Sequence, residues 1–252
     1  KLLGKRRIKR KGVNKKMKNL VLITSIVHIS TNPLSYSNTR SVFTPEERFT
    51  QIQKTIQSVR EKIPHSVIFL IECSNITLEQ EQYFRSHCDY FFNVVNEPDM
   101  VHGTTSFSKS LGEGILTIWS LEYIMKNGIE FDQLFKISGR YWLNDRFDYT
   151  HFNQDDICVH FPTIHRPEPK VCIDETTLVH SDIMVTTLYN LPKRVIPDWC
   201  HFLKEKIPDM CRAIQFENLF TEFVLKSNQP IYHIRPFGIN GHVAVDNFFY
   251  DM

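Results

Sequence analysis

The residue types best suited to ligand chemistry lie in the segment 131–148, FDQLFKISGRYWLNDRFD, where an apolar run ends abruptly at Ser138-Gly139-Arg140. In open α/β sheets the carboxyl ends of the strands line the ligand crevice, and a glycine there lets the backbone approach a ligand closely. Arg140 would present a planar, permanently charged fork to a phosphate or carboxylate. The alternative is a strand-to-turn junction whose arginine forms an ordinary surface salt bridge.

Four more elements bring polar residues to the same expected edge. Thr24 and Ser25 lie in the first apolar run of the chain, and Glu72 directly follows the second. Lys109 stands at an expected helix start, where the helix dipole disfavours a cation, and a phosphate partner would explain it. Arg48, in the first turn of another helix, could face the same ligand, or it could simply be solvated on the helix surface.

An alternation of strands and helices positions these residues. The apolar and amphipathic patterns predict strands at 19–29, 66–71, 90–95 and 131–137, and helices at 45–62, 77–87 and 108–126. Such an alternation is typical of a central, mostly parallel sheet flanked by helices, a Rossmann-like α/β fold. The polar segments 30–45 and 102–106 are predicted to be loops.

The second half of the chain has less regular patterns. It predicts strands at 156–161, 173–179 and 231–234, and helices at 182–191, 197–206 and 215–226. Neither an internal repeat nor a linker divides the sequence. We therefore expect a single α/β domain over residues 19–252.

Composition favours an ordinary globular protein and argues against nucleic-acid binding. Of 252 residues, 42% are hydrophobic and 23% charged. Residues 1–18 hold ten Lys or Arg and no acid, while the remainder carries 20 basic and 28 acidic side chains, a net charge of −8. A nucleic-acid-binding domain would normally carry a basic face. We interpret residues 1–18 as a basic extension, disordered or vector-encoded, preceding a natural start near Met17.

Hydropathy patterning predicts a chain without membrane spans. No stretch approaches the roughly 20 apolar residues that a span needs. The apolar run 20–29 imitates a signal peptide, but polar residues interrupt it and no small-residue cleavage site follows. We expect a cytoplasmic location, in the host cytoplasm if the chain is viral.

The order of elements and several local segments resemble the nucleotide-sugar half of GT-A glycosyltransferases. The resemblance covers residues 19 to about 226. Within it, the chain is similar in particular to uncharacterised glycosyltransferases from viral and capsular-polysaccharide loci. It rests on LVLITSIVHIS, ERFTQIQKTIQSVREKIPHSVIFLIECS, KSLGEGILTIWSLEYI and FKISGRYWL. It implies a hexosyl- or pentosyltransferase that moves a sugar from a UDP- or GDP-sugar to a glycan or glycoprotein hydroxyl.

The resemblance also implies a nucleotide-sugar site. In GT-A enzymes the loop of the first strand holds the nucleobase, and an acid after the second strand often meets base or ribose. The matching positions here hold Thr24-Ser25 and Glu72. The family's DxD metal motif corresponds to Ser138-Gly139-Arg140, so the motif is missing. We favour a metal-independent site in which Arg140, with Lys109 or Arg48, carries the positive charge.

A metal-dependent site stays open as the alternative. Asp145 and Asp148, further along the chain, could recruit Mn²⁺ or Mg²⁺, whose oxygen ligands would help to neutralise a leaving diphosphate.

Inverting transfer needs a carboxylate that deprotonates the acceptor hydroxyl. By its place in the order of elements, the resemblance assigns this role to Glu217 in AIQFENLF, with Glu222 on the same helix as a reserve. The alternative for Glu217 is a first-turn acid stabilised by the helix dipole. Asp174 and Glu175, at the end of an expected strand, form the competing acid pair.

Two other function classes stay open. No GxGxxG or comparable glycine-rich turn follows the first apolar run, which argues against a dinucleotide-dependent oxidoreductase or a methyltransferase. The non-enzymatic alternative is a nucleotide-sugar or carbohydrate-binding module that has lost catalysis, as the missing DxD would allow.

Overall fold

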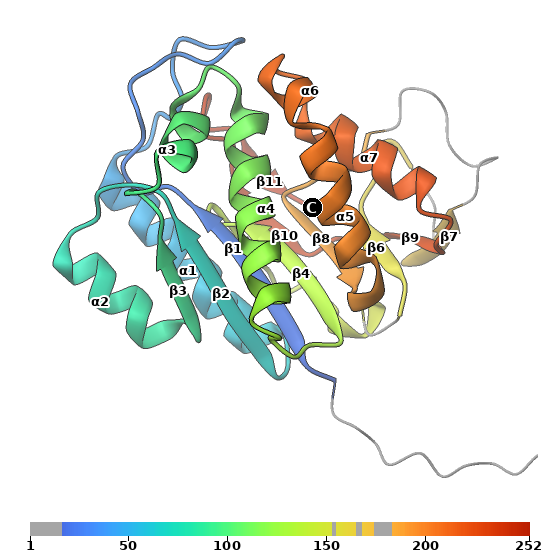
Figure 1. The fold of residues 1–252 in the computed structure, drawn as a ribbon. Coiled ribbons are helices and arrows are strands. Elements are labelled where there is room, and N and C mark those ends of the chain that lie inside the picture. Colours follow the sequence, from blue (N-terminus) through green and yellow to red (C-terminus); the bar gives the residue numbers. More distant parts are fainter. Residues whose placement is uncertain (1–16, 153–154, 165–167, 174–182) are drawn as a thin grey trace, which may run out of the picture.

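A mixed sheet lies between two layers of helices in the computed structural model of the chain, which describes residues 17–152, 155–164, 168–173 and 183–252 (Figure 1). Its eight strands follow the order β3-β2-β1-β4-β8-β6-β9-β7. Their bounds are β1 Asn19–Ser25, β2 Ser66–Glu72, β3 Tyr90–Asn93, β4 Gln133–Ser138, β6 Ile157–Val159, β7 Lys170–Ile173, β8 Leu188–Pro192 and β9 Ile231–Ile234.

Most strands of this sheet run in one direction. β1 to β4 are parallel to one another, and β6 and β9 run with them, whereas β8 and β7 run against them. This arrangement confirms the predicted α/β fold with a mostly parallel central sheet. Successive strands extend from β1 through β2 to β3, while β4 joins the other side of β1. The strand order therefore reverses between β1 and β4, and α/β sheets bind ligands at such a switch point.

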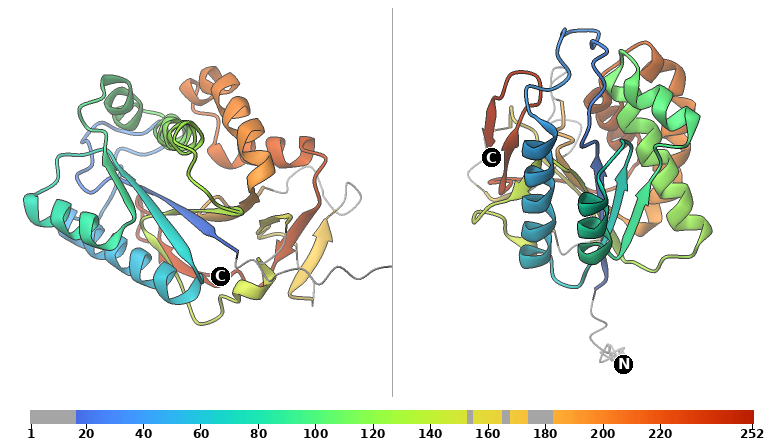
Figure 2. Two further views of the ribbon diagram at one scale, coloured as in Figure 1. Left: turned by 60° about the horizontal axis from the view of Figure 1, so that its bottom comes forward. Right: turned by 90° about the vertical axis from the view of Figure 1, so that its left-hand side faces the viewer.

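Both faces of the sheet are buried, which explains why the first strands read as continuous apolar runs. In β1, Leu20 and Leu22 belong to one hydrophobic cluster, and Val21 and Ile23 to the other. The helices α1 Pro45–Lys62 and α2 Leu78–His87 contribute to the second cluster. The helices that contribute to the first, on the opposite face (Figure 2), are α3 Pro98–Thr105, α4 Lys109–Lys126, α5 Ile196–Glu205, α6 Ile207–Cys211 and α7 Phe216–Lys226.

Local signals fix the two helices that frame the switch point. Thr44 begins α1 in a capping box: its hydroxyl accepts from the Glu47 amide, and the Glu47 carboxylate accepts from the Thr44 amide. Ser108 caps α4 by accepting from the Leu111 amide, and Gly128, at φ +61°, follows its end. Both helices thus begin near the carboxyl edge of the parallel strands.

A second, three-stranded antiparallel sheet lies beside α1. It consists of β5 Tyr141–Leu143, β10 Ile239–His242 and β11 Phe249–Asp251 in the order β11-β10-β5. The Thr55 hydroxyl on α1 donates to the Tyr141 carbonyl at 2.7 Å, which ties β5 to the helix. This sheet brings the C-terminal segment back to the carboxyl end of β4. Short 3₁₀ turns lie at Tyr149–His151 and Lys193–Val195.

Three local predictions need correction. The described part of the helix expected at 182–191, residues 183–191, is not helical and leads into β8. All five residues of β8 are buried, so the strand lacks the alternating pattern of a half-exposed strand. The segment 102–106 is not an open loop, because α3 runs to Thr105 with Pro98 in its first turn. β1 ends at Ser25 rather than at Ile29. The strand expected at 173–179 lies almost wholly outside the described residues.

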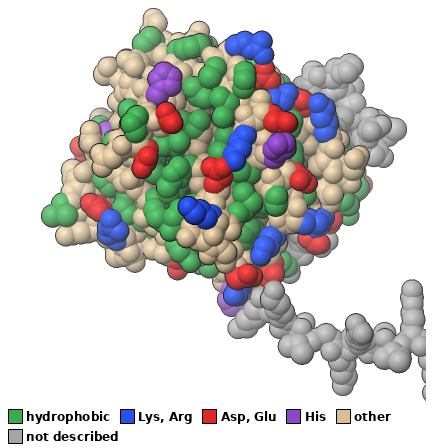
Figure 3. Space-filling model, in the orientation of Figure 1, with side chains coloured by type: hydrophobic (Ala, Val, Ile, Leu, Met, Phe, Trp, Pro, Cys, Tyr) green, Lys and Arg blue, Asp and Glu red, His purple; other side chains and the backbone are tan. Residues whose placement is uncertain are grey.

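The face of the molecule that carries α3, α4 and α5 has a mixed surface. Lys and Arg side chains lie there among Asp and Glu side chains, with hydrophobic side chains between them (Figure 3). Within the described ranges, no helix has the length and apolar character needed to cross a bilayer.

Candidate functional site

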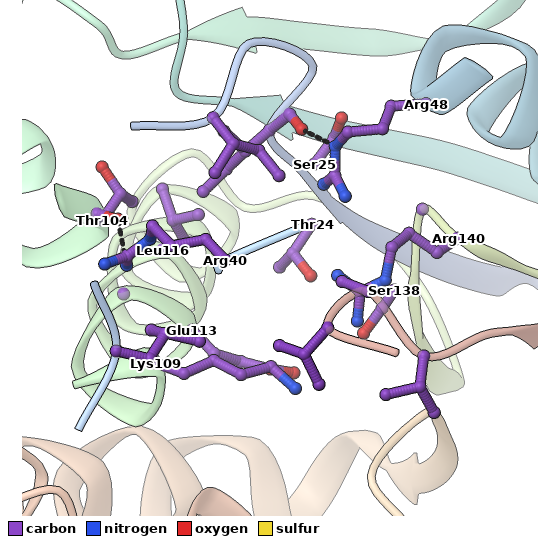
Figure 4. A pocket seen from close by; sticks show the side chains of 18 of the residues that line it. Thr24, Ser25, Arg40, Arg48, Thr104, Lys109, Glu113, Leu116, Ser138 and Arg140 are labelled. Atoms are coloured by element: carbon purple, nitrogen blue, oxygen red, sulfur yellow. Dashed lines mark hydrogen bonds between the residues drawn. The ribbon is translucent and has the colours of Figure 1, made fainter. Parts of the chain in front are cut away.

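A pocket opens at the switch point, at the carboxyl ends of β1 and β4. Its walls come from the end of β1, the loop before α1, the two helices α1 and α4, the β4–β5 turn and the C-terminal segment Val243–Val245 (Figure 4). Seven of the eight residues predicted to bind a nucleotide sugar are brought together here: Thr24, Ser25, Arg48, Lys109, Ser138, Gly139 and Arg140.

Gly139 allows the β4–β5 turn to lie against β1. Its amide donates to the Thr24 carbonyl at 3.0 Å, so the turn continues the pairing of the two strands. A Cβ atom at this position would stand 3.0 Å from Cγ1 of Ile52 and 3.4 Å from the Thr24 carbonyl oxygen. A side chain here would press on Ile52, so glycine suits the close approach of the turn that carries Ser138 and Arg140.

Two arginines on opposite sides of the switch point face the pocket. Arg48 is 5% exposed and donates from Nε to the Ile26 carbonyl at 2.7 Å. Burial lowers the pKa of Arg48, the neighbouring Arg140 lowers it further, and Glu72 acts in the opposite direction. The Nε atom of Arg140 is buried and has no hydrogen-bond partner among the described residues. Two guanidinium groups that repel each other, one of them unsatisfied, form a ready site for an anion.

Glu72 is placed behind the pocket wall rather than in it. It is fully buried, accepts from the Ser25 and Ser74 hydroxyls at 2.5 and 2.6 Å, and accepts from the Val27 amide at 3.0 Å. Burial raises the pKa of Glu72, although these hydrogen bonds and Arg48 pull it down in part. Glu72 therefore reaches the pocket through Ser25, whose position and hydroxyl orientation it fixes.

Residues that sequence reasoning missed complete the α4 side of the pocket. Glu113 lies one turn after Lys109 on α4 and lines the pocket. It forms an ion pair with Lys136, a fully buried lysine of β4 that also donates to the Ser138 hydroxyl at 3.0 Å. The signals for this pair were a lysine inside the apolar run of β4 and a carboxylate near the start of α4.

Arg40 is a further cation that sequence reasoning missed. It lines the pocket from the loop before α1 and donates to the carbonyls of Thr104 and Ser106, at the end of α3, at 2.8 and 2.6 Å. Burial lowers the pKa of Arg40. Its contacts hold the loop across the pocket mouth, where the exposed ring of Tyr36 also lines the pocket.

The described lining residues carry four cations and one carboxylate: Arg40, Arg48, Lys109, Arg140 and Glu113. Lys136, the partner of Glu113, and the buried Glu72 are not among the lining residues. The pocket is therefore electropositive and suited to a polyanion such as a diphosphate.

The candidate base, Glu217, lies in the first turn of α7, outside the set of lining residues. Its Oε1 atom accepts from the Thr186 hydroxyl at 2.9 Å, and the carbonyl of the next residue, Thr187, accepts from the Ser138 amide at 3.2 Å. Glu217 is thus connected to the end of β4 through two residues. Glu222, by contrast, is ion-paired with Lys206 and Lys226 at 2.9 and 2.7 Å.

The candidate metal ligands are not brought together. Asp145 pairs with Lys62 at the last residue of α1, at the far end of the sheet from the pocket, and Asp148 accepts from Thr150 in a 3₁₀ turn. Asp174 and Glu175 lie outside the described residues. Within the described ranges, no three His, Cys, Asp or Glu side chains cluster as metal ligands. At the β4 end, where the DxD motif would stand, the donor set does not fit a divalent ion.

Comparison with known proteins identifies the fold. No protein-family model matches the sequence, and no curated protein matches it either. Among solved structures, a nucleoside-diphosphate-sugar pyrophosphorylase from Vibrio cholerae RC9 is similar with a TM-score of 0.52 and 10% identity, over 90% of this chain and 97% of that one.

Two other solved structures have lower TM-scores. A 4-diphosphocytidyl-2C-methyl-D-erythritol synthase from Anaerococcus prevotii DSM 20548 has a TM-score of 0.45 at 10% identity, covering 88% of this chain and 89% of that one. A glycosyltransferase involved in the glycosylation of the major capsid of PBCV-1 has 0.38 at 8% identity, covering 75% and 66%. Of these three, the first reaches fold level: this chain shares the α/β fold of the pyrophosphorylase.

Proposed function

We propose that this chain is a glycosyltransferase that moves a sugar from a UDP- or GDP-sugar to a hydroxyl group of a glycan or glycoprotein. One observation carries the proposal. At the switch point of the sheet, Arg48, Lys109 and Arg140 face one pocket, and the buried Nε of Arg140 lacks a partner. A diphosphate offers the charge and the acceptor atoms that these groups need, because guanidinium groups bind phosphates through paired hydrogen bonds.

The same groups suit the leaving diphosphate. As the acceptor oxygen forms its bond to the anomeric carbon, the bond from that carbon to the phosphate oxygen breaks, and negative charge grows on the diphosphate. Cations already fixed around the pocket stabilise this charge without reorganising. They are charged side chains of the protein, so the proposed site is metal-independent.

Glu217 is the proposed base for an inverting transfer. Its carboxylate takes the proton of the acceptor hydroxyl while the new bond forms on the face of the sugar opposite the diphosphate. Its connection to Ser138 through Thr186 and Thr187 supports this role, since it lies beyond the β4 end of the pocket, where an acceptor would approach. In this proposal Asp174 is the competing base.

Calorimetric titration with UDP, GDP and their common sugar conjugates tests the donor site. We expect at least one sugar nucleotide to bind, and Arg140→Ala to weaken binding by about 1.5–3 kcal/mol, the usual scale of a hydrogen bond to a charged group. Arg146→Ala is the matched control, because Arg146 lies six residues further on and is ion-paired with Asp251. Unchanged affinity in Arg140→Ala, or no binding of any sugar nucleotide at millimolar concentration, would contradict the proposal.

A nucleotidyltransferase is the second candidate, because a solved structure that is similar at fold level is a nucleoside-diphosphate-sugar pyrophosphorylase. In that reaction a sugar phosphate attacks the α-phosphate of a nucleoside triphosphate and releases pyrophosphate, and the same cationic pocket would hold the phosphates. Incubation with UTP or GTP and hexose 1-phosphates separates the two. Pyrophosphate release would favour nucleotidyl transfer, whereas slow hydrolysis of a sugar nucleotide favours glycosyl transfer. Binding without either turnover indicates a non-catalytic module.

A further inference from the structure

Glu113 is the one carboxylate among the described residues that line the cationic pocket. Its side chain is 16% exposed and reaches into the pocket beside that of Lys109 (Figure 4). Oε1 accepts from the Lys136 ammonium, and Oε2 has no hydrogen-bond partner among the described residues. One oxygen is therefore fixed by the protein while the other is left for a ligand.

The surroundings keep this carboxylate ionised. Burial alone would raise the pKa of Glu113, but Lys136, Lys109 and Arg140 outweigh burial, so the pKa is lowered. An ionised carboxylate with a lowered pKa is a weak proton acceptor and a strong hydrogen-bond acceptor. It suits a hydroxyl group that donates a hydrogen bond and keeps its proton.

A carboxylate in this place works against phosphate binding. It repels a diphosphate held by the neighbouring cations, and a buried ion pair adds little net stability compared with well-packed apolar residues. A carboxylate that selects a hydroxyl would offset that repulsion, because a site built to hydrogen-bond a hydroxyl rejects ligands that lack it.

The neighbours of Glu113 indicate which hydroxyl it meets. Glu72 accepts from Ser25 at the end of β1, whereas Glu113 is paired with Lys136, which donates to Ser138 at the end of β4. A diphosphate between the two arginines would place one end of the donor on each side. The β4 side is also the side of Glu217, and the transferred sugar must lie between the diphosphate and the acceptor.

We infer that Glu113 is a specificity-determining residue that accepts a hydrogen bond from a hydroxyl group of the transferred sugar, with Lys136 as the residue that positions it. The inference rests on the proposed function, since it needs a sugar nucleotide in the pocket. Glu113 thereby distinguishes a nucleoside diphosphate sugar from the bare nucleoside diphosphate that leaves after transfer.

The test compares two affinities in each variant: that for UDP or GDP, and that for the sugar conjugate that binds the unmodified chain. Glu113→Gln should bind the bare nucleoside diphosphate more tightly, because a repelling charge is gone. The ratio of sugar-nucleotide to nucleotide affinity should fall about 10–100-fold, the scale of one hydrogen bond to a charged group. Glu122→Gln is the matched control: it makes the same change on the same helix, in a pair with Lys204, and should alter neither affinity.

Glu113→Gln leaves the buried Lys136 without its carboxylate partner, which could impair folding. The double variant Glu113→Gln/Lys136→Met, which removes both charges, is therefore measured as well. The same fall of the ratio in the double variant supports the inference. An unchanged ratio in either folded variant overturns the inference alone and leaves the proposed function standing. No binding of any sugar nucleotide to the unmodified chain overturns the proposed function, and the inference with it.

Discussion

Two glutamates border the same pocket, and their different partners give them opposite acid–base properties. Glu72, on the β1–β2 side, accepts from two hydroxyl groups and one amide, with Arg48 as a weaker influence, and its pKa is raised. Glu113, on the α4–β4 side, is surrounded by two lysines and an arginine, and its pKa is lowered. Neutral donors and one arginine offset only part of the cost of burying Glu72, whereas the two lysines and the arginine near Glu113 exceed that cost.

This difference separates the two sides of the pocket by role. The β1–β2 side is sealed, because Glu72 uses both its oxygens within the protein and holds Ser25 and the backbone after β1 in place. The α4–β4 side is charged and open, because Glu113, Lys109 and Arg140 all line the pocket. We therefore expect the first side to shape the site and the second to recognise the ligand.

Neither of these glutamates is suited to be the catalytic base. We therefore expect the largest effect on turnover from a change to Glu217. Glu72 is sealed from any acceptor, and the lowered pKa of Glu113 makes it a weak proton acceptor. Glu217→Gln should therefore lower turnover of the sugar nucleotide by about 10²–10⁴-fold, the range for losing general-base catalysis, while donor affinity stays unchanged. Turnover and calorimetric binding measured on the same preparation test this.

Glu222→Gln is the control for that prediction, because Glu222 lies on the same helix and is paired with lysines. It should leave turnover unchanged. Near-normal turnover of Glu217→Gln together with an inactive Asp174→Asn or Glu175→Gln would move the base to that pair, and a product with retained configuration would exclude the single-base mechanism.

The second prediction concerns stability on the charged side. Lys136→Met leaves Glu113 without its buried partner, and we expect the free energy of unfolding to fall by about 3 kcal/mol, the lower end for breaking a buried ion pair, since Lys109 and Arg140 still face Glu113. Denaturant unfolding measures it. Adding Glu113→Gln should restore most of the loss. A double variant as unstable as Lys136→Met would show that Lys136 acts by packing rather than by charge.

The positions of strand ends and helix starts in the sequence predict some of the residues on the charged α4–β4 side of the pocket. Arg140 and Lys109 were predicted from the turn after an apolar run and from a cation at a helix start, and the structure brings both to one pocket. Lys136 and Glu113 could not be paired in advance, because their contact depends on how α4 lies across β4. The place of Arg40 in the pocket could not be predicted, because it depends on the path of residues 30–44, which have no periodic pattern. The sequence predicts Glu72 at the correct strand end, but its burial behind the pocket wall depends on the path of the chain after β1.

The wrong prediction of a helix at 182–191, where the structure has β8, also has a physical cause. Leu188 and Leu191 are three residues apart, which fits a helix, yet β8 lies inside the sheet with both faces covered. Period-two alternation disappears in such a strand.

The smallest expected effect is a pair of opposite pH dependences, and it tests the comparison of the two glutamates directly. The folded chain holds the Glu72 proton more tightly than the unfolded chain, so the stability that Glu72 contributes is full below the ordinary glutamate pKa and is lost as pH rises through its raised pKa. Glu113 behaves the other way: its contribution is present above the ordinary pKa and is lost as pH falls through its lowered pKa.

Glutamine keeps the shape of either side chain and does not titrate, so each variant removes one of these dependences. The measured quantity is the free energy of unfolding of each variant minus that of the unmodified chain. For Glu72→Gln this difference should become more favourable as pH rises above the ordinary glutamate pKa. For Glu113→Gln it should become more favourable as pH falls below that pKa. Each slope is limited to about 1.4 kcal/mol per pH unit, the linkage of a single proton. Denaturant unfolding of both variants across acidic to neutral pH measures the two slopes. Slopes of the same sign would mean that hydroxyl groups and ammonium groups stabilise these carboxylates alike, and the distinction between a sealed side and a charged side would no longer hold.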